Sequence, residues 1–235
     1  MRNKMRLTVV IPIWNDPATL REILATIAGL RGVDEVIVGD ASANDDCAQI
    51  TIADGARLVR CAKPGRGQQM NAAASVATGD VILFQHADTE LRQAHVDSLL
   101  AAMDDAEVVG GAFHRKFDAR HPRLMWLECW NRILAEQGGT LFGDQSLFVR
   151  REIFERMGGY RAFPLMEDVD FSKRLRDEGR RVVLDPPIAT SARHHTQRGS
   201  WRTSLRNATM LLLFALGASP DFLHAWYYRR WKPRA

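Results

Sequence analysis

The sequence has few cysteines and no long apolar run, the features that mark disulfide-bonded, zinc-binding and membrane-spanning proteins. Its 235 residues include three cysteines, Cys47, Cys61 and Cys129, an odd number without the spacing of a metal site. We therefore expect reduced thiols. The longest apolar run, residues 210–218, falls well short of the roughly 20 residues that cross a bilayer.

We also expect no secretory leader, and the sequence shows no internal repeat or low-complexity linker. The basic start, residues 1–6, leads into a short apolar run that ends in Pro-Ile-Trp-Asn-Asp instead of a small-residue cleavage site. We therefore expect a cytoplasmic protein, for which the inner face of the membrane is one place of action.

The excess of one charge sign is small, with a formal net charge of +4 and a pI of about 9.2. This charge suits anionic partners such as nucleotides or phospholipid headgroups. The sequence has no motif that reads nucleic acid, so we expect no such partner. Basic residues concentrate in residues 193–234, where Asp221 is the single acid. That segment is either a solvated helix surface or a surface that approaches anionic lipid.

The first half of the chain alternates between continuous apolar runs and helical periodicity. The first predicted helix has Asp16 at its N-cap and Pro17 at its first position. Such alternation predicts an α/β fold with a mostly parallel sheet, which binds ligands at the carboxyl ends of its strands. The predicted strands are residues 7–13, 35–40, 57–59 and 81–84, and the predicted helices are residues 17–28, 44–53, 66–77 and 91–103.

The second half is less regular and ends in a helical tail. Pro186 and Pro187 are expected to stop the last strand. We divide the chain into a domain of residues 1–200, with one half at about 1–90 and a second at about 91–200, and an apolar, basic tail of residues 201–235. The predicted strands are residues 108–117, 147–149 and 181–184, and the predicted helices are residues 124–136, 151–157, 169–178, 201–217 and 220–231.

Two acidic positions suggest chemistry. Asp88 follows a buried strand, where a carboxylate suits a divalent metal and a diphosphate. On an extended chain, the His86 side chain two residues earlier points to the same side as Asp88, which suits a metal ligand or a phosphate contact. Asp168, beside Glu167, begins a helix, where a carboxylate can act as a general base. Each also has a plain interpretation, because carboxylates cap turns and favour the first turn of a helix.

Other polar positions give weaker signals. Asp40 and Asp16 suit either a nucleoside contact or a turn and a helix cap. Arg66 and Gln69 begin a helix after a glycine turn, where an anion can bind. Asp144 and Gln145 form a polar cluster that suits the donor sugar, the acceptor or a plain turn. Of His194 and His195, at most one is expected to be a metal ligand, because adjacent side chains point apart.

The order of these motifs resembles the family 2 glycosyltransferases over nearly the whole chain. Residues 9–16, Val-Val-Ile-Pro-Ile-Trp-Asn-Asp, resemble the family's opening Val-Ile-Pro-x-Tyr-Asn-Glu, and residues 35–45 resemble its second motif. Residues 86–88, His-Ala-Asp, resemble its metal-binding Asp-x-Asp, and residues 166–168 its Glu-Asp site. The match is most similar to a bacterial subgroup with His-Ala-Asp at the metal site.

The resemblance implies a GT-A fold, a nucleotide-diphosphate sugar as donor, Mg²⁺ or Mn²⁺ as cofactor, and inversion at the anomeric carbon. It makes residues 1–200 the glycosyltransferase domain, with the nucleotide-sugar half at about 1–90 and the acceptor half at about 91–200. By matching position, Pro12, Asp16 and Asp40 contact the nucleoside, Asp88 binds the metal and Asp168 is the base. His86 stands where the family has the first acid of Asp-x-Asp, so the metal site of this chain offers a nitrogen in place of one carboxylate.

Our leading hypothesis is an inverting glycosyltransferase that acts on an acceptor hydroxyl, with a lipid-linked acceptor as one option because of the tail. A sugar nucleotidyltransferase is the less favoured enzyme, because residues 14–17, Trp-Asn-Asp-Pro, stand where its long glycine-rich loop would be. A non-catalytic nucleotide-sugar-binding protein is the alternative that the change at His86 leaves open.

Overall fold

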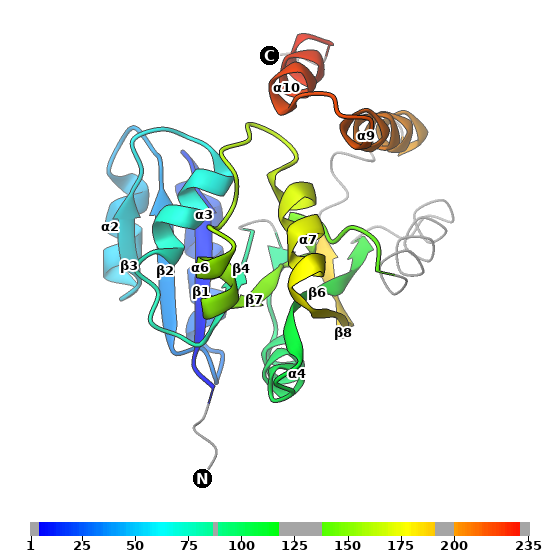
Figure 1. The fold of residues 1–235 in the computed structure, drawn as a ribbon. Helices are drawn as coiled ribbons and strands as arrows, with labels where there is room; N and C mark the ends of the chain where they lie inside the picture. The colour runs from blue at the N-terminus through cyan, green and yellow to red at the C-terminus, as the bar shows by residue number, and fades with distance from the viewer. Residues whose placement is uncertain (1–4, 87–88, 118–137, 191–199, 231–235) are drawn as a thin grey trace.

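A computed structural model describes residues 5–86, 89–117, 138–190 and 200–230 of the chain (Figure 1). Within these residues, helices flank an eight-stranded sheet in the order β3-β2-β1-β4-β7-β6-β8-β5. The two last helices stand at one end of this body and form a tail. The α/β fold with a C-terminal helical tail is therefore confirmed.

The first half of the sheet is parallel, as predicted. Each strand is followed by a helix on its way to the next, so the carboxyl ends of the strands share one edge. The Asp16 carboxylate accepts a hydrogen bond from the backbone N of Thr19 at 3.1 Å, which confirms the predicted helix start. The elements are β1 (Leu7–Ile13), α1 (Pro17–Ala28), β2 (Glu35–Asp40), α2 (Asp46–Ala53), β3 (Arg57–Arg60), α3 (Arg66–Ala74) and β4 (Val81–Phe84).

The second half of the sheet is mixed. Strand β7 runs antiparallel to both β4 and β6, so it joins the two halves. The helix predicted at residues 124–136 lies outside the described residues. The elements are β5 (Thr89–Glu90), α4 (Gln93–Met103), β6 (Val108–Phe117), η1 (Gly143–Gln145), β7 (Phe148–Arg150), α6 (Arg151–Arg156), α7 (Glu167–Glu178) and β8 (Arg180–Thr190).

Strand β8 corrects the prediction that Pro186 and Pro187 end the last strand. It continues to Thr190 and pairs with β6 in parallel. Leu184 lies opposite Phe113 and Ile188 lies opposite Arg115, so residues 185–187 bulge out of the ladder. Proline has no N–H to donate, and it is tolerated here because the pairing is interrupted at the bulge.

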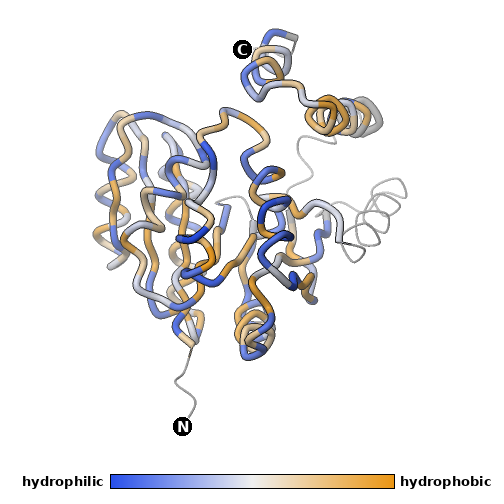
Figure 2. The backbone as a smooth tube through the Cα atoms, in the orientation of Figure 1, coloured by the Kyte–Doolittle hydropathy of each residue, from blue (hydrophilic) through white to orange (hydrophobic). Residues whose placement is uncertain are grey.

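Buried side chains cover both faces of the sheet, as the continuous apolar runs predict. Leu7, Val9 and Ile11 of β1 point to the face covered by α1 and α4, and Val10 points to the face covered by α3 and α7. Figure 2 shows the hydrophobic strands inside the body and hydrophobic residues along the first tail helix. The two faces therefore form separate cores, and the start of α3 and the start of α7 share one of them.

One buried polar side chain holds the carboxyl edge of the parallel strands together. The Gln69 amide nitrogen donates to the carbonyl oxygen of Ile13 at 2.6 Å and to that of Gly39 at 2.9 Å. Its amide oxygen accepts a hydrogen bond from the backbone N of Gly65 at 3.2 Å. Gln69 thus ties the ends of β1 and β2 to the first turn of α3.

The tail consists of α9 (Ser200–Ala215) and α10 (Pro220–Arg230). Met210 of α9 and Leu223 of α10 are buried. The Phe214 ring meets the Phe163 ring of the body, with centroids 6.4 Å apart. Among the described residues, no helix combines the length and the apolar character needed to cross a bilayer.

The substitution Gln69→Leu should lower the free energy of unfolding by about 1 to 3 kcal/mol, because it removes the buried donor shared by the Ile13 and Gly39 carbonyl groups and the acceptor of the Gly65 backbone N. Urea unfolding followed by circular dichroism measures this loss. The matched control is Gln68→Leu at the exposed neighbouring position, which should stay within about 0.5 kcal/mol of wild type. Equal effects of the two substitutions would contradict the structural role of Gln69.

Candidate active site

Five residues from four separate segments meet near the carboxyl edge of the sheet. Arg66 begins α3, His86 follows β4, Gly143 begins η1, and Glu167 and Asp168 begin α7. We call this group of five residues the carboxylate cluster. The structure thus brings together four of the predicted site residues, namely Arg66, His86, Glu167 and Asp168.

Asp168 is held by two backbone donors. One carboxylate oxygen, Oδ2, accepts a hydrogen bond from the backbone N of Gly143 at 2.8 Å, and Oδ1 accepts one from that of Val169 at 2.8 Å. Burial raises the pKa of Asp168, while the Gly143 hydrogen bond and the Arg66 charge oppose the rise. A fixed carboxylate with a raised pKa can take a proton from a hydroxyl more readily than one in water.

Glu167, the other member of the pair, is also buried, with 7% of its surface exposed. Burial and the neighbouring Asp168 carboxylate raise the pKa of Glu167 to about 7, and the Arg66 charge works against this rise. Two adjacent carboxyl groups in one site do not ionise independently. The pair can therefore hold a proton near neutral pH, which suits acid–base chemistry.

Two glycines allow these segments to approach one another. A Cβ atom on Gly67 would lie 3.2 Å from the Cβ of Tyr160 and 3.4 Å from the Cβ of Glu167. A Cβ atom on Gly143 would lie 2.9 Å from ring atoms of His86. The first turn of α3 can therefore contact the start of α7, and η1 can contact His86, because no side chain separates them.

His86 contributes a neutral imidazole. Burial and the Arg66 charge lower the pKa of His86 well below its ordinary value. Its side chain is 7% exposed, and its Nε2 atom has no hydrogen-bond partner in the described part of the chain. A buried nitrogen of this kind is suited to a ligand or a metal ion.

Backbone strain also concentrates around the carboxylate cluster. The non-glycine residues with positive φ in the described ranges are Asn15 at 51°, Ser146 at 51° and Met166 at 69°. Asn15 follows β1, Ser146 follows η1 and Met166 directly precedes Glu167. Hydrogen bonds to residues distant in the sequence hold two of them, from the Asn15 backbone N to Ser42 Oγ and from Ser146 Oγ to Gln85 Oε1, both at 2.8 Å. Such strain is typical of functional sites.

The three residues predicted to contact a nucleoside lie on or beside the ends of β1 and β2. Asp40 is fully buried, accepts from the backbone N of Ser42 at 2.7 Å, and pairs with Arg60 at 2.7 Å. Asp16 caps α1, and Pro12 lies opposite Gly39 in the ladder. The plain interpretations of both carboxylates are thus realised, and the nucleoside contacts stay predictions.

Asp144 and Gln145 differ in what they can offer a ligand. The Asp144 carboxylate pairs with Arg115 at 2.7 Å and is 30% exposed. The Gln145 amide donates to the carbonyl oxygen of Phe113 at 3.1 Å and accepts from the backbone N of Phe142 at 2.8 Å. Gln145 therefore stabilises η1. No motif marks Arg115, because its part in the site depends on β6 passing next to η1.

Most of the residues considered as metal ligands from the sequence lie outside the part of the chain that the structure describes. Asp88, His194 and His195 lie outside the described residues. Within the described residues, no group of three His, Cys, Asp or Glu side chains could hold a metal ion.

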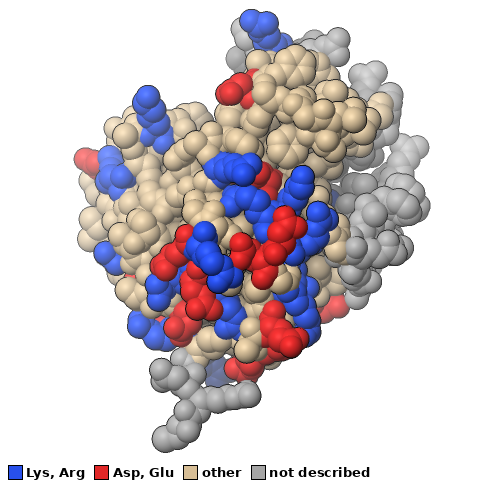
Figure 3. Space-filling view, viewed as in Figure 1, with Lys and Arg blue, Asp and Glu red and all other residues tan. Residues whose placement is uncertain are grey.

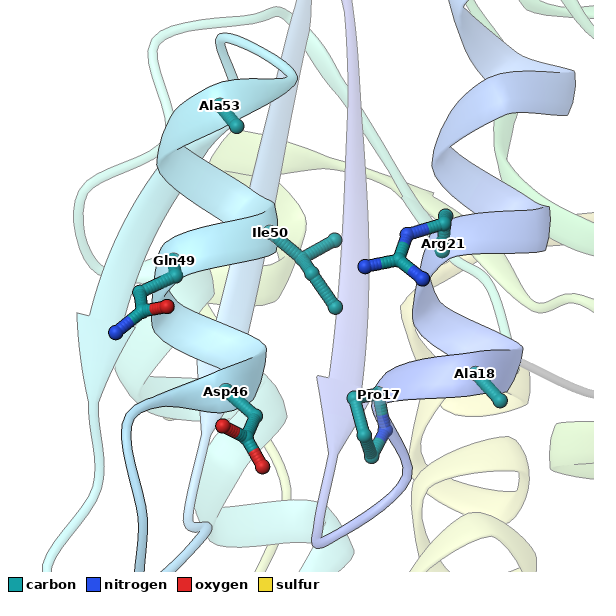
Figure 4. Close-up of a pocket in the computed structure, with 7 residues that line it drawn as sticks. All are labelled: Pro17, Ala18, Arg21, Asp46, Gln49, Ile50 and Ala53. Carbon is teal, nitrogen blue, oxygen red and sulfur yellow. The ribbon is translucent and has the colours of Figure 1, made fainter.

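A hollow of about 480 Å³ lies away from the carboxylate cluster, between α1 and α2. Figure 4 shows Arg21 and Ile50 facing each other across it. Helix α1 covers the opposite face of the sheet from α3 and α7, so this hollow does not belong to the site. Its lining residues are Pro17, Ala18, Arg21, Asp46, Gln49, Ile50 and Ala53.

Comparison with known proteins gives a family match. The model of Glycosyl transferase family 2 matches residues 8–158. An uncharacterised protein of Mycobacterium tuberculosis, MT1568, is 29% identical over 82% of this chain and 68% of its own length. The pre-mycofactocin glycosyltransferase of the same organism is 25% identical over 83% of this chain, which spans 44% of that protein.

Solved structures confirm the predicted GT-A fold. The mannosyltransferase PcManGT from Pyrobaculum calidifontis has a TM-score of 0.70 at 19% identity and covers 97% of this chain and 70% of its own. Residues 1–349 of TarS from S. aureus have a TM-score of 0.66 at 19% identity. That match covers 80% of this chain and 61% of TarS 1–349, so this chain spans less than two thirds of it.

The substitution Glu167→Gln should stabilise the protein at pH 8 by about 2 to 3 kcal/mol and should have little effect at pH 4. The folded state keeps Glu167 protonated up to about pH 7, whereas the unfolded chain ionises it near 4.5, so the wild type loses stability as the pH rises between these values. Urea unfolding in metal-free buffer at the two pH values measures the difference.

The exposed residue Glu22 of α1 provides the control for this titration, as Glu22→Gln. A stabilisation by Glu167→Gln that is equal at both pH values would show that the carboxyl of Glu167 does not titrate near 7.

Proposed function

This chain belongs to glycosyl transferase family 2, and from that membership we propose that it moves a sugar from a nucleotide-diphosphate sugar to an acceptor hydroxyl. The observation that carries this proposal is the carboxylate cluster, in which two carboxyl groups with raised pKa values lie near a cationic helix start. In sheets of this type, ligands bind outside the carboxyl ends of the parallel strands.

The identity of the donor class is supported by what similar proteins bind. The mannosyltransferase PcManGT is known in complex with GDP-Man and Mn²⁺, and TarS 1–349 in complex with UDP-GlcNAc. We extend to this chain the shared chemistry, a nucleotide-diphosphate sugar together with a divalent cation. Residues 1–90 would hold the donor, with Pro12, Asp16 and Asp40 at the nucleoside.

The residues present fit a divalent cation in part. The unpartnered Nε2 of His86 is a nitrogen ligand, which suits Mn²⁺ better than Mg²⁺, and Asp88 would supply a carboxylate. A cation held by these residues supplies positive charge that stabilises the departing diphosphate. Arg66 and the first turn of α3 would bind the same phosphate oxygens, because a helix N-terminus with a nearby cation attracts anions.

The reaction would proceed by in-line displacement with inversion. The acceptor oxygen forms a bond to the anomeric carbon, the bond from that carbon to the diphosphate breaks, and Asp168 takes the acceptor proton on a carboxylate oxygen. The backbone N–H groups of Gly143 and Val169 fix the orientation of this base. Glu167 keeps the local charge low by holding a proton, and Asp144, paired with Arg115, would meet the donor sugar or the acceptor.

The substitution Asp168→Asn should lower the rate of nucleoside diphosphate release from the matching donor by about 10²- to 10⁴-fold, the usual contribution of a general base. Donor affinity should stay within about threefold of wild type, because an asparagine oxygen can still accept from the Gly143 backbone N. The control is Asp177→Asn at an exposed position of the same helix. Unchanged turnover in Asp168→Asn would remove Asp168 as the base, and no turnover in wild type would favour a non-catalytic binding protein.

Titration calorimetry with UDP, GDP and their sugars, with and without Mn²⁺, should show metal-dependent binding of one nucleotide. The substitution Asp88→Ala should remove the dependence on Mn²⁺ and weaken binding at least tenfold, because the cation loses its carboxylate ligand. Binding of equal strength with and without Mn²⁺ in the wild type would contradict the metal site.

A further inference from the structure

Helix α9 presents an apolar stripe to the outside. Leu205, Leu212 and Leu216, the last in the turn that follows the helix, recur at a spacing that places them on one side of α9. Their exposures are 59%, 59% and 76%. The opposite side is used inside the protein, since Met210 is buried and Phe214 contacts Phe163. One side of α9 therefore holds the tail in place, and the other stays uncovered in the described structure.

Exposed apolar side chains concentrate in the tail. The described residues expose seven large hydrophobic side chains, and Trp14 and Ile52 are the two that belong to the body. Figure 3 shows the tail as a surface that is largely neither acidic nor basic on the face in view. Exposed apolar groups that gather in this way mark an interaction surface. The other five are Leu205, Leu212, Leu216, Phe222 and Tyr228.

The charge of residues 193–235 indicates which kind of partner this apolar surface binds. Residues 193–235 contain eight Arg or Lys and one acidic residue, Asp221. A second copy of the chain would bring two basic tails together, which like-charge repulsion opposes. An anionic bilayer complements both properties, because apolar side chains can enter its interface while basic side chains meet its phosphate groups.

We propose that the tail docks this protein on the surface of an anionic membrane, with Leu205, Leu212 and Leu216 of the α9 stripe entering the interface. The membrane is bound from one side and is not crossed. This surface is separate from the carboxylate cluster and needs neither donor nor metal.

The position of the tail connects this surface to the site. Phe163, which contacts Phe214, lies in the segment that leads into α7 and precedes Glu167 by four residues. A bilayer under the tail therefore lies on the side of the molecule from which that segment enters the site. Together with the proposed sugar transfer, on which this step rests, the placement points to an acceptor hydroxyl carried by a lipid headgroup.

Co-sedimentation with vesicles tests the docking surface on the full chain. Wild-type protein should bind vesicles that contain 30% phosphatidylglycerol in phosphatidylcholine at low salt, and binding should fall at least fivefold in 0.5 M NaCl. The double substitution Leu212→Glu and Leu216→Glu should lower the partition coefficient at least tenfold, because it places two carboxylates in the apolar stripe. The matched control, Ile52→Glu, changes a side chain of α2 with similar exposure and should bind as wild type does.

Three vesicle results would overturn the docking proposal: no binding of wild type to anionic vesicles, equal binding to pure phosphatidylcholine, or unchanged binding of the double variant.

Sedimentation velocity without lipid tests the alternative of a second copy. A wild-type dimer that the double variant dissociates would assign the stripe to a second copy and overturn the proposal. Circular dichroism confirms that the variant is folded. Calorimetry on the same samples measures binding of the nucleotide donor, on which the proposed sugar transfer depends. The double substitution should leave this binding unchanged, so a failure of the proposed function can be told apart from a failure of docking.

Discussion

The position of the Glu167 and Asp168 carboxylates depends on one carboxamide, that of Asn71. Asn71, on α3, donates from Nδ2 to the carbonyl oxygen of Tyr160 at 2.7 Å and accepts on Oδ1 from its backbone N at 2.8 Å. Arg174, on α7, holds the same segment from the other side by donating to the carbonyl oxygens of Met157 and Gly159. The segment before α7 is thus fixed against α3. The electrostatic effect of Arg66 on the two carboxyl groups requires this arrangement, because the groups come from halves of the chain that no short loop connects.

The features that the sequence predicted correctly are those with a local or periodic cause. Strand β1 is buried on both faces, so its apolar residues are consecutive, and Asp16 and Pro17 form a helix start from neighbouring residues alone. The same holds for Glu167 and Asp168, which lie together because they are adjacent at the start of α7. Their raised pKa values could not be predicted from neighbouring residues, because the main cause is burial by the folded chain, and the opposing charge comes from Arg66, about a hundred residues away in the sequence.

The features that the sequence did not predict depend on contacts between residues that are far apart in the sequence. The strand pairing of residues 188–190 could not be foreseen beyond two prolines, because the bulge that accommodates the prolines is set by the register with β6. Gln69 and Gln145 resemble ligand-binding amides in sequence, yet both bind backbone carbonyls whose location only the folded sheet defines. Arg115 gave no signal at all, since its partner Asp144 lies in another segment. Polar residues of this kind are identified as structural only by the groups they contact.

The two edges of the sheet have a consequence for how the protein behaves at high concentration. Strand β3, at one edge, has four residues and exposes Arg57 and Arg60 at its ends, and β5, at the other edge, has only two residues. Short edge strands with charged side chains offer few free backbone groups to an incoming strand. The β3 edge is therefore a poor template for strand addition. At the other edge β5 pairs with β8 only at Ala189 and Thr190, so there the bulge at Pro186 and Pro187, more than the short β5, interrupts the row of backbone groups that an incoming strand would need.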